Sequence, residues 1–520
     1  MNKLTQFLVA SIFVLLLWQG LHLPFEIPDE QSHFATVNFL VDQGRIQGEN
    51  EYDLSREQQQ VEYLFGVMTD GTNQYAHNPK HRLDYSSEVL VKNEELIRSL
   101  NTPENRSTYT LHQGAVYPPL YYYLTGIFYR SSYSSDIVAR LYTSRIFSTL
   151  LVVATLYVYY RIGRLIWSSS KMGYYFASLA LLYPMTSYMG AGVNPDNLHN
   201  LLFSIFVYVC IRVIKDGLTY VHTLHFALIL VLDLLTKPQA YIMIPITLIV
   251  IAISWPKYSL NLVLKNLLLY FLVILVGVGW HEIPKFYSGN PYITGATTSS
   301  GSYLSPIVYL KMILNKFTSE LVVWYWGVFK WTTIIVPRLW WWSGIRMILL
   351  AVIGLAFSLF RALRSKNFGF IHKLIIFASA ANIIYVAALV YYDWNYYHLS
   401  GRSLGFQARY FMPLLSTQLF LIVEGLRSFT RKNYLNKIIL GMVFVFFLTL
   451  QLVSVYVVAS SYYDTSDIPS FIVQVSQYKP VYFQLDYWYL WMGLYVASIT
   501  STSIFIYRQI EKLKINSKPS

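Results

Sequence analysis

The chain has 520 residues, of which 55% are hydrophobic and only 13% are charged. Apolar windows of about twenty residues, long enough to cross a bilayer, recur throughout. This composition excludes a soluble multidomain protein and predicts one all-α membrane domain over 1–520. The net charge of +13 is compatible with nucleic-acid binding, but Lys and Arg concentrate in short links between apolar runs, as the positive-inside rule describes. We therefore expect the bilayer, and no nucleic acid, as a partner.

The first apolar run, 4–23, is predicted to span the cell membrane with Lys3 on the cytoplasmic side. A polar extracytoplasmic loop, 24–117, follows and is rich in Gln, Asn, Glu and Tyr. Three stretches of this loop are expected to be helical, near 29–44, 51–66 and 86–100. Two prolines then precede an aromatic segment, 120–129, which is short for a span. We predict a helix at the outer interface there, because Tyr is favoured at that depth.

Eleven further apolar runs bring the predicted number of spans to about twelve: 141–162, 172–190, 197–214, 222–235, 239–255, 262–281, 343–361, 371–391, 409–426, 436–459 and 487–507. With this count the basic links and both termini fall in the cytoplasm. The loops 282–342, 392–408 and 460–486 then fall outside. One missed or extra span near 118–130 or 222–255 would reverse the sidedness of every later segment.

Two adjacent carboxylates, Asp29 and Glu30, follow the first span, and His33 comes about one helical turn later. If the segment after Pro28 is helical, Asp29 and His33 share a face at i and i+4. Acids at a helix start complement the helix dipole, so a purely structural role is open. The alternative is catalytic, because a positioned carboxylate can deprotonate an acceptor hydroxyl. A neighbouring acid and His33 would then tune it or help to hold a divalent cation.

Cations at the outer ends of spans are unusual, because basic residues favour the cytoplasmic side. Arg140 and Arg145 begin one span, and either they snorkel or one of them faces an anion. Lys237 lies between two apolar runs, where its charge is unfavourable unless it is paired with an anion or hydrated. It has Asp233 four residues earlier as a possible ion-pair partner, or it binds a phosphate as a point charge.

Two polar motifs enter later spans from the outside. Asn194-Pro195-Asp196 forms a short link in which Asp196 either caps a helix or faces a site. Gln407 and Arg409, with Arg402 just before them, stand at the start of another span. The planar guanidinium of Arg409 would match a pair of phosphate oxygens.

Three function classes remain. The absence of a Walker motif and of a Gly-rich dinucleotide turn argues against an ATP-driven pump in this chain alone. A transporter or flippase for a lipid-linked glycan would need ionisable groups deep within spans, and the apolar runs here contain few. A non-catalytic cell-envelope assembly protein would tolerate neutral substitutions at Asp29, Lys237 and Arg409. An enzyme acting on the far side of the membrane is favoured by the outer acids and cations.

The motifs Pro-Asp-Glu-x-x-His-Phe, Tyr-Pro-Pro-Leu-Tyr-Tyr from Tyr117, Asn-Pro-Asp, Lys-Pro-x-x-Tyr and Gln-x-Arg-Tyr-x-x-Pro occur here in one order. This ordered set resembles a widespread family of bacterial membrane proteins within the GT-C glycosyltransferase superfamily, which includes protein mannosyltransferases and aminoarabinose transferases. The resemblance covers about residues 5–460. It implies a helical bundle with surface helices in the first outer loop. It also implies transfer of a sugar from a polyprenyl-phosphate donor to a cell-envelope acceptor.

By this resemblance Asp29 is the catalytic base, with Glu30 as its partner. The outer cations would hold the donor phosphate: Arg140, Lys237, Arg402 and Arg409. The supporting residues would be His33, Tyr117, Asp196 and Gln407. Members of the superfamily differ in their use of a divalent cation, so Mg²⁺ or Mn²⁺ stays open, with Asp29, Glu30 and His33 as candidate ligands. A single displacement would invert the anomeric configuration of the sugar.

Overall fold

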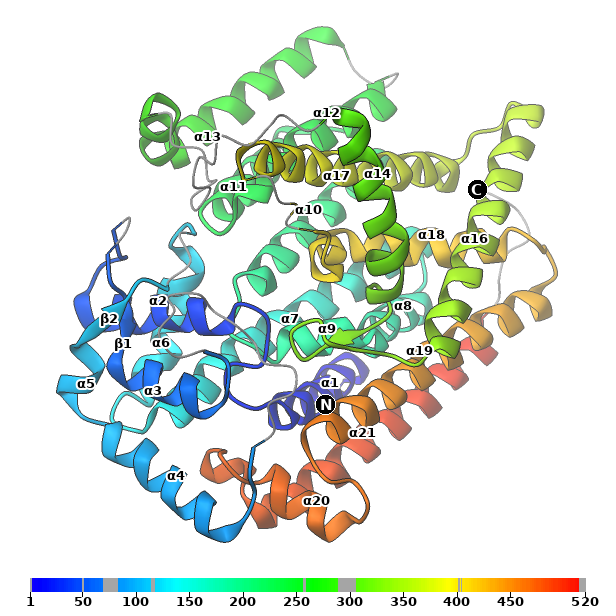
Figure 1. Ribbon diagram of the computed structural model, residues 1–520. Coiled ribbons are helices and arrows are strands. Elements are labelled where there is room, and N and C mark those ends of the chain that lie inside the picture. Colours follow the sequence, from blue (N-terminus) through cyan, green and yellow to red (C-terminus); the bar gives the residue numbers. More distant parts are fainter. Residues whose placement is uncertain are drawn as a thin grey trace.

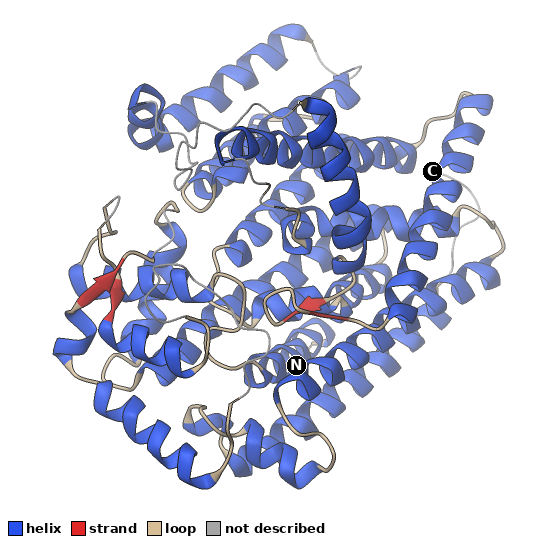
Figure 2. Cartoon of the chain, viewed as in Figure 1, coloured by secondary structure: helices blue, strands red, loops and turns tan. Residues whose placement is uncertain are grey.

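The computed structural model describes residues 2–48, 51–68, 83–113, 117–255, 259–288, 305–400, 403 and 405–513, without the side chains of 280–288 and 399–400. The described chain is mostly helical, with two small antiparallel sheets, β1–β2 and β3–β4 (Figure 2). The elements follow in chain order: α1 (Lys3–Leu21), α2 (Glu30–Gln43), β1 (Leu54–Ser55), α3 (Arg56–Leu64), α4 (Ser87–Leu100), α5 (Pro103–Ser107), β2 (Tyr109–Leu111), α6 (Leu120–Ser131), α7 (Ile137–Trp167), α8 (Ser170–Leu182), α9 (Pro184–Gly190), α10 (Asp196–Asp216), α11 (Tyr220–Leu234), η1 (Pro238–Ile242), α12 (Met243–Ser254), α13 (Leu260–Ser288), α14 (Pro306–Lys316), η3 (Phe317–Leu321), α15 (Val322–Trp324), β3 (Val328–Phe329), β4 (Ile334–Ile335), α16 (Arg338–Ser365), α17 (Phe370–Ser400), η4 (Ala408–Leu414), α18 (Leu415–Arg427), α19 (Asn433–Tyr462), α20 (Ile468–Val475), η5 (Val481–Phe483) and α21 (Leu485–Glu511).

Each of the predicted apolar runs contains helix, and the predicted all-α membrane fold is confirmed. Within the described residues, eight single helices are long and apolar enough to cross a membrane: α1, α7, α10, α13, α16, α17, α19 and α21. The remaining predicted spans are short or interrupted. Prolines at 184 and 413 break or distort two of them, because proline removes a backbone donor and clashes with the preceding turn. Pro238 begins a short 3-10 turn in the link between two others.

The long helices differ in how much of their apolar surface is covered. In α10 and α7, 78% and 61% of the most apolar window is buried, against 22% in α16. α7 and α10 therefore form the centre of the bundle, and α16 presents most of its apolar surface outward, as expected of a helix that contacts lipid. The pair α7–α8 packs so closely that a Cβ on Gly163 would lie 2.9 Å from the Met172 carbonyl oxygen.

The first loop, 24–117, folds against one side of this bundle, where α2 to α5 and the following α6 lie together in blue and cyan (Figure 1). The three predicted helices correspond to α2, α3 and α4, except that 51–55 is not helical and its last two residues pair as β1 with β2. The turn between α1 and α2 is buried, and Phe25 and Ile27 have no exposed surface. A Cβ on Gly192 would lie 2.5 Å from the Ile27 side chain, so this close approach requires glycine. The fold thus clamps the turn that ends at Asp29.

Candidate active site

Asp29 lies at the end of the buried turn between α1 and α2. Its backbone is left-handed (φ 62°, ψ 6°), a conformation that Asp and Asn adopt more readily than other L residues. Although Asp29 is the N-cap residue of α2, its side chain makes no capping hydrogen bond. The carboxylate instead forms an ion pair with Arg409, and 40% of the Asp29 side chain is exposed. Asp29 therefore stands at the start of α2 without capping it through its side chain, and its carboxylate is accessible.

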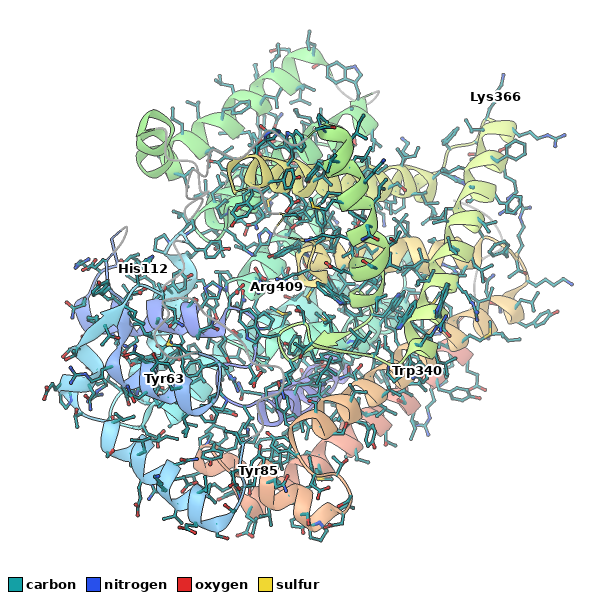
Figure 3. All side chains as sticks on the ribbon, in the orientation of Figure 1. Tyr63, Tyr85, His112, Trp340, Lys366 and Arg409 are labelled. Carbon is teal, nitrogen blue, oxygen red and sulfur yellow. The ribbon has the colours of Figure 1, made fainter. Side chains whose placement is uncertain are left out.

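Arg409 comes from η4, at the opposite end of the sequence. Figure 3 shows it near the centre of the molecule, between the first-loop helices and the long helices. Its side chain is only 5% exposed, and besides Asp29 it donates to the carbonyl oxygen of Pro28 at 3.2 Å. The guanidinium carbon lies 5.3 Å from the centre of the Tyr410 ring. A buried guanidinium needs a counter-anion, and Asp29 provides it.

Lys237 is the second cation of the site, and it forms an ion pair with Asp196. Both side chains are about 6% exposed. Lys237 thus pairs with Asp196 and not with Asp233, which was one of its two possible roles: the Asp233 carboxylate contacts Nδ1 of His199 at 2.8 Å. The reason is local, because Lys237 precedes Pro238 and its backbone is extended (φ −154°, ψ 138°). Asp233 and Lys237 therefore do not share a helix face.

A shared carbonyl group connects the two ion pairs. The Pro28 oxygen accepts hydrogen bonds from Arg409 and from Nδ2 of Asn194, the latter at 3.1 Å. The side-chain oxygen of Asn194 in turn accepts from the backbone N–H of Asp196 at 2.9 Å. Four segments far apart in the sequence thus meet at one point, and they are the segments that carry Asp29, Asp196, Lys237 and Arg409.

Aromatic side chains surround these charges. The Tyr117 and Tyr410 ring centres lie 5.5 and 6.0 Å from Nζ of Lys237. The His33 ring lies 5.6 Å from that of Tyr117, and its Nδ1 is 2.9 Å from the hydroxyl of Tyr122. Burial lowers the pKa of His33 to about 4, although the nearby carboxylates oppose this shift. His33 is therefore a neutral hydrogen-bonding group at pH 7.

Glu30 has a different environment from its neighbour Asp29. It is fully buried and forms an ion pair with Arg145 of α7, with N–O distances of 2.6 and 2.7 Å. Its two oxygens also accept from the backbone N–H groups of Phe25, at 3.1 Å, and Val193, at 3.0 Å. Glu30 thus joins α7 and the link before α10 to the turn that carries Asp29. This arrangement favours a positioning role for Glu30 over direct contact with a substrate.

Arg140 does not join the site, in contrast to its predicted role in binding the donor phosphate. It is buried and pairs with Glu57 of α3 and with the hydroxyl of Tyr129. This pair fastens the first loop to α7. Glu57 was not predicted, because an acid in the first turn of a loop helix already complements the helix dipole.

The other two predicted residues of this region are Arg402 and Gln407. Arg402 lies outside the described residues. Gln407 directly precedes η4 and is half-buried, and its backbone carbonyl accepts from the N–H of Tyr410 at 3.1 Å.

The three predicted metal ligands do not form a common set. The Glu30 carboxylate is occupied by Arg145, and His33 contacts Tyr122. Among the described residues, no group of three or more His, Cys, Asp or Glu side chains is placed to hold a metal ion. In this arrangement Asp29, Glu30 and His33 do not fit a divalent cation.

An apolar cavity of about 680 Å³ lies between α16, α17, α18 and the segment from η3 to α15. Its walls include Leu321, Trp326, Ile348, Leu355, Phe411 and Ile422. Polar groups are few, and Gln418 is bound to Asn382 at 3.0 Å. Phe411 follows Arg409 by two positions in η4, so one short turn carries a cation of the site and a wall of the cavity. The sequence could not predict this cavity, because its walls come from separate segments.

A comparison with proteins of curated function gives no match. ArnT from Cupriavidus metallidurans in the apo state is similar at a TM-score of 0.45 and 14% identity, over 98% of this chain and 76% of that one. Its structure bound to undecaprenyl phosphate has a TM-score of 0.44 at 13% identity, over 96% and 74%. The Archaeoglobus fulgidus oligosaccharyltransferase tethered with an acceptor peptide has a TM-score of 0.39 at 11% identity, over 92% and 55%. The sequence model of DUF2142, described as a predicted membrane protein, matches residues 12–418, and the chain belongs to this family.

Proposed function

We propose that this protein is an inverting glycosyltransferase of the GT-C type. It would move a sugar from a polyprenyl-phosphate donor to a hydroxyl of a cell-envelope acceptor. The observation that carries the proposal is the contact between Asp29 and Arg409, with Lys237 beside it and an apolar cavity on the same turn. This combination offers an accessible carboxylate for an acceptor, buried cations for a phosphate and a cavity for an apolar chain.

The proposed reaction is a single displacement at the anomeric carbon. Asp29 takes the proton of the acceptor hydroxyl while the acceptor oxygen forms its bond to that carbon. The bond between the anomeric carbon and the phosphate oxygen breaks, and its electron pair remains on the departing polyprenyl phosphate. Attack from the face opposite the leaving group inverts the configuration.

The two cations act on the leaving group. Negative charge grows on the phosphate as the bond breaks, and Lys237 and Arg409 would stabilise this charge in surroundings that largely exclude water. Glu30 would hold the turn beneath Asp29 through its bonds to Phe25, Val193 and Arg145. We place the reaction on the extracytoplasmic side, because the positive-inside distribution of Lys and Arg puts the first loop there.

The test is a transfer assay with purified protein in nanodiscs, a panel of undecaprenyl-phosphate sugars, and measurement of released undecaprenyl phosphate. We expect Asp29→Asn to lower the transfer rate by about 10²- to 10⁴-fold, the usual contribution of a general base. Asp42→Asn is the matched control, because Asp42 lies at the far end of α2 and bonds the Tyr109 hydroxyl at 2.8 Å. The control should transfer at the wild-type rate.

Two results would contradict the proposal. If the Asp29→Asn variant transfers sugar at the wild-type rate, Asp29 is not the catalytic base. If the wild-type protein binds no undecaprenyl phosphate, the proposed class of donor is contradicted, whatever its sugar.

A further inference from the structure

The two cations of the site are paired with carboxylates in different ways. In the pair of Lys237 and Asp196, both side chains are about 6% exposed. In the pair of Arg409 and Asp29, the guanidinium side is 5% exposed and the carboxylate side is 40% exposed. The first pair is buried on both sides, and the second is buried on the cation side only.

This asymmetry determines which contact can open. If Lys237 and Asp196 separate, two charges remain buried without a partner, which is strongly unfavourable. If Arg409 and Asp29 separate, water can solvate the Asp29 carboxylate because 40% of its side chain is exposed, and only the buried Arg409 needs a new anion. An incoming anion therefore replaces Asp29 at much lower cost than it replaces Asp196.

Arg409 also has bonding capacity left. Its Nε is buried and has no hydrogen-bond acceptor among the described residues. Its Nη1 donates to Pro28 and its Nη2 to Asp29. As placed here, Asp29 accepts only from Nη2 and leaves the Nε–H unsatisfied. The donor phosphodiester has two non-bridging oxygens, which can accept from Nε and Nη2 together. A buried donor without an acceptor is unfavourable, so the exchange gains a bond.

We propose that the donor phosphate takes the place of Asp29 on Arg409, so that donor binding releases the catalytic carboxylate toward the acceptor. This inference rests on the proposed function and adds an order to it, with donor first and acceptor activation second. Asp196 stays on Lys237 throughout and keeps that ammonium group in position. Because the two events are linked, Asp29 opposes donor binding by the same free energy with which the donor frees Asp29.

The test is a double-mutant cycle on binding, with farnesyl phosphate as the probe and farnesol as the uncharged control. The four proteins are wild type, Asp29→Asn, Arg409→Gln and the double variant. We expect Asp29→Asn to bind farnesyl phosphate about threefold tighter or more, although it loses transfer. In the Arg409→Gln background, the same substitution should change affinity by less than about twofold.

Three results would overturn the inference. Asp29→Asn could bind with unchanged or weaker affinity. It could bind more tightly in both backgrounds, which would indicate long-range repulsion and not competition for Arg409. If Arg409→Gln does not fold, the ratio of wild-type to Asp29→Asn affinities is measured in low and high salt. A ratio that disappears in high salt would also indicate long-range repulsion, because salt screens exposed charges.

Failure of the inference and failure of the proposed function give different results. Loss of transfer in Asp29→Asn with unchanged affinity contradicts only the exchange at Arg409. A wild-type protein that binds neither farnesyl phosphate nor undecaprenyl phosphate contradicts the proposed donor and the exchange together.

Discussion

The buried pair of Glu30 and Arg145 leads to a prediction about stability. Each Glu30 oxygen accepts two hydrogen bonds, one from Arg145 and one from a backbone N–H. In Glu30→Gln an NH₂ group replaces one oxygen and faces two donors, so two bonds are lost. Arg145, which has no exposed surface, loses its counter-charge. Breaking a buried pair from one side costs about 3–5 kcal/mol, and we expect a decrease of that size in the free energy of unfolding.

The assay is denaturant unfolding in detergent, followed by near-UV circular dichroism. The control is Glu51→Gln, which breaks the pair of Glu51 with Arg45 at the exposed surface of the first loop. That variant should unfold at the wild-type denaturant concentration, because exposed pairs contribute little. If Glu30→Gln unfolds at the same denaturant concentration as the control, the pair of Glu30 and Arg145 does not hold the Asp29 turn. The positioning role of Glu30 would then be refuted.

Three further predictions concern pH and metal. Burial raises the pKa of Glu62 from 4.5 to about 8, so its neutral form favours folding and stability is lost as pH rises across that window. Glu62→Gln should remove this loss, which is up to about 1.4 kcal/mol per pH unit. The denaturant midpoint of the variant should then change less with pH between pH 5 and 8 than that of the wild type. The lowered pKa of His33 has the opposite sign: its contribution to the free energy of unfolding is complete above pH 6.5 and is lost as pH falls through about 4. The transfer rate should therefore show no change between pH 6 and 7 that depends on His33. A change in this range that His33→Gln abolishes would contradict the prediction. Because Glu30 and His33 already bind Arg145 and Tyr122, we expect transfer to persist in EDTA, and loss with rescue by Mg²⁺ or Mn²⁺ would refute this.

The sequence was sufficient for the architecture and for the residue types at the site. Apolar runs identified the helices because length and hydropathy alone decide whether a segment fits a bilayer. The ordered motifs identified a family of multi-spanning membrane proteins, and the family match over 12–418 confirms that prediction. The motifs that carry Asp29, Asp196, Lys237 and Arg409 do meet, although no sequence distance indicates it. Their roles in transfer remain predictions.

The pairing of these charges could not be predicted, because it depends on long-range packing. Arg140 meets Glu57 across 83 positions. The helix that carries Glu57 was predicted, but nothing in the sequence indicates where it docks. The alternative pair of Lys237 with Asp233 could have been discounted from the sequence. The following proline disfavours a helical backbone at Lys237, which already argued against a helical pair with Asp233.

The left-handed backbone at Asp29 explains how two adjacent acids acquire separate environments. Along a continuous helix their side chains would point about 100° apart, whereas here the turn sends Glu30 toward Arg145 and Asp29 toward Arg409. Asn adopts this conformation as readily as Asp, so Asp29→Asn changes the charge and keeps the turn. Alanine would add about 1–2 kcal/mol of backbone strain and could displace Glu30 as well. A loss of transfer in Asp29→Asn with normal stability can therefore be assigned to the carboxylate, whereas the same loss in Asp29→Ala could not.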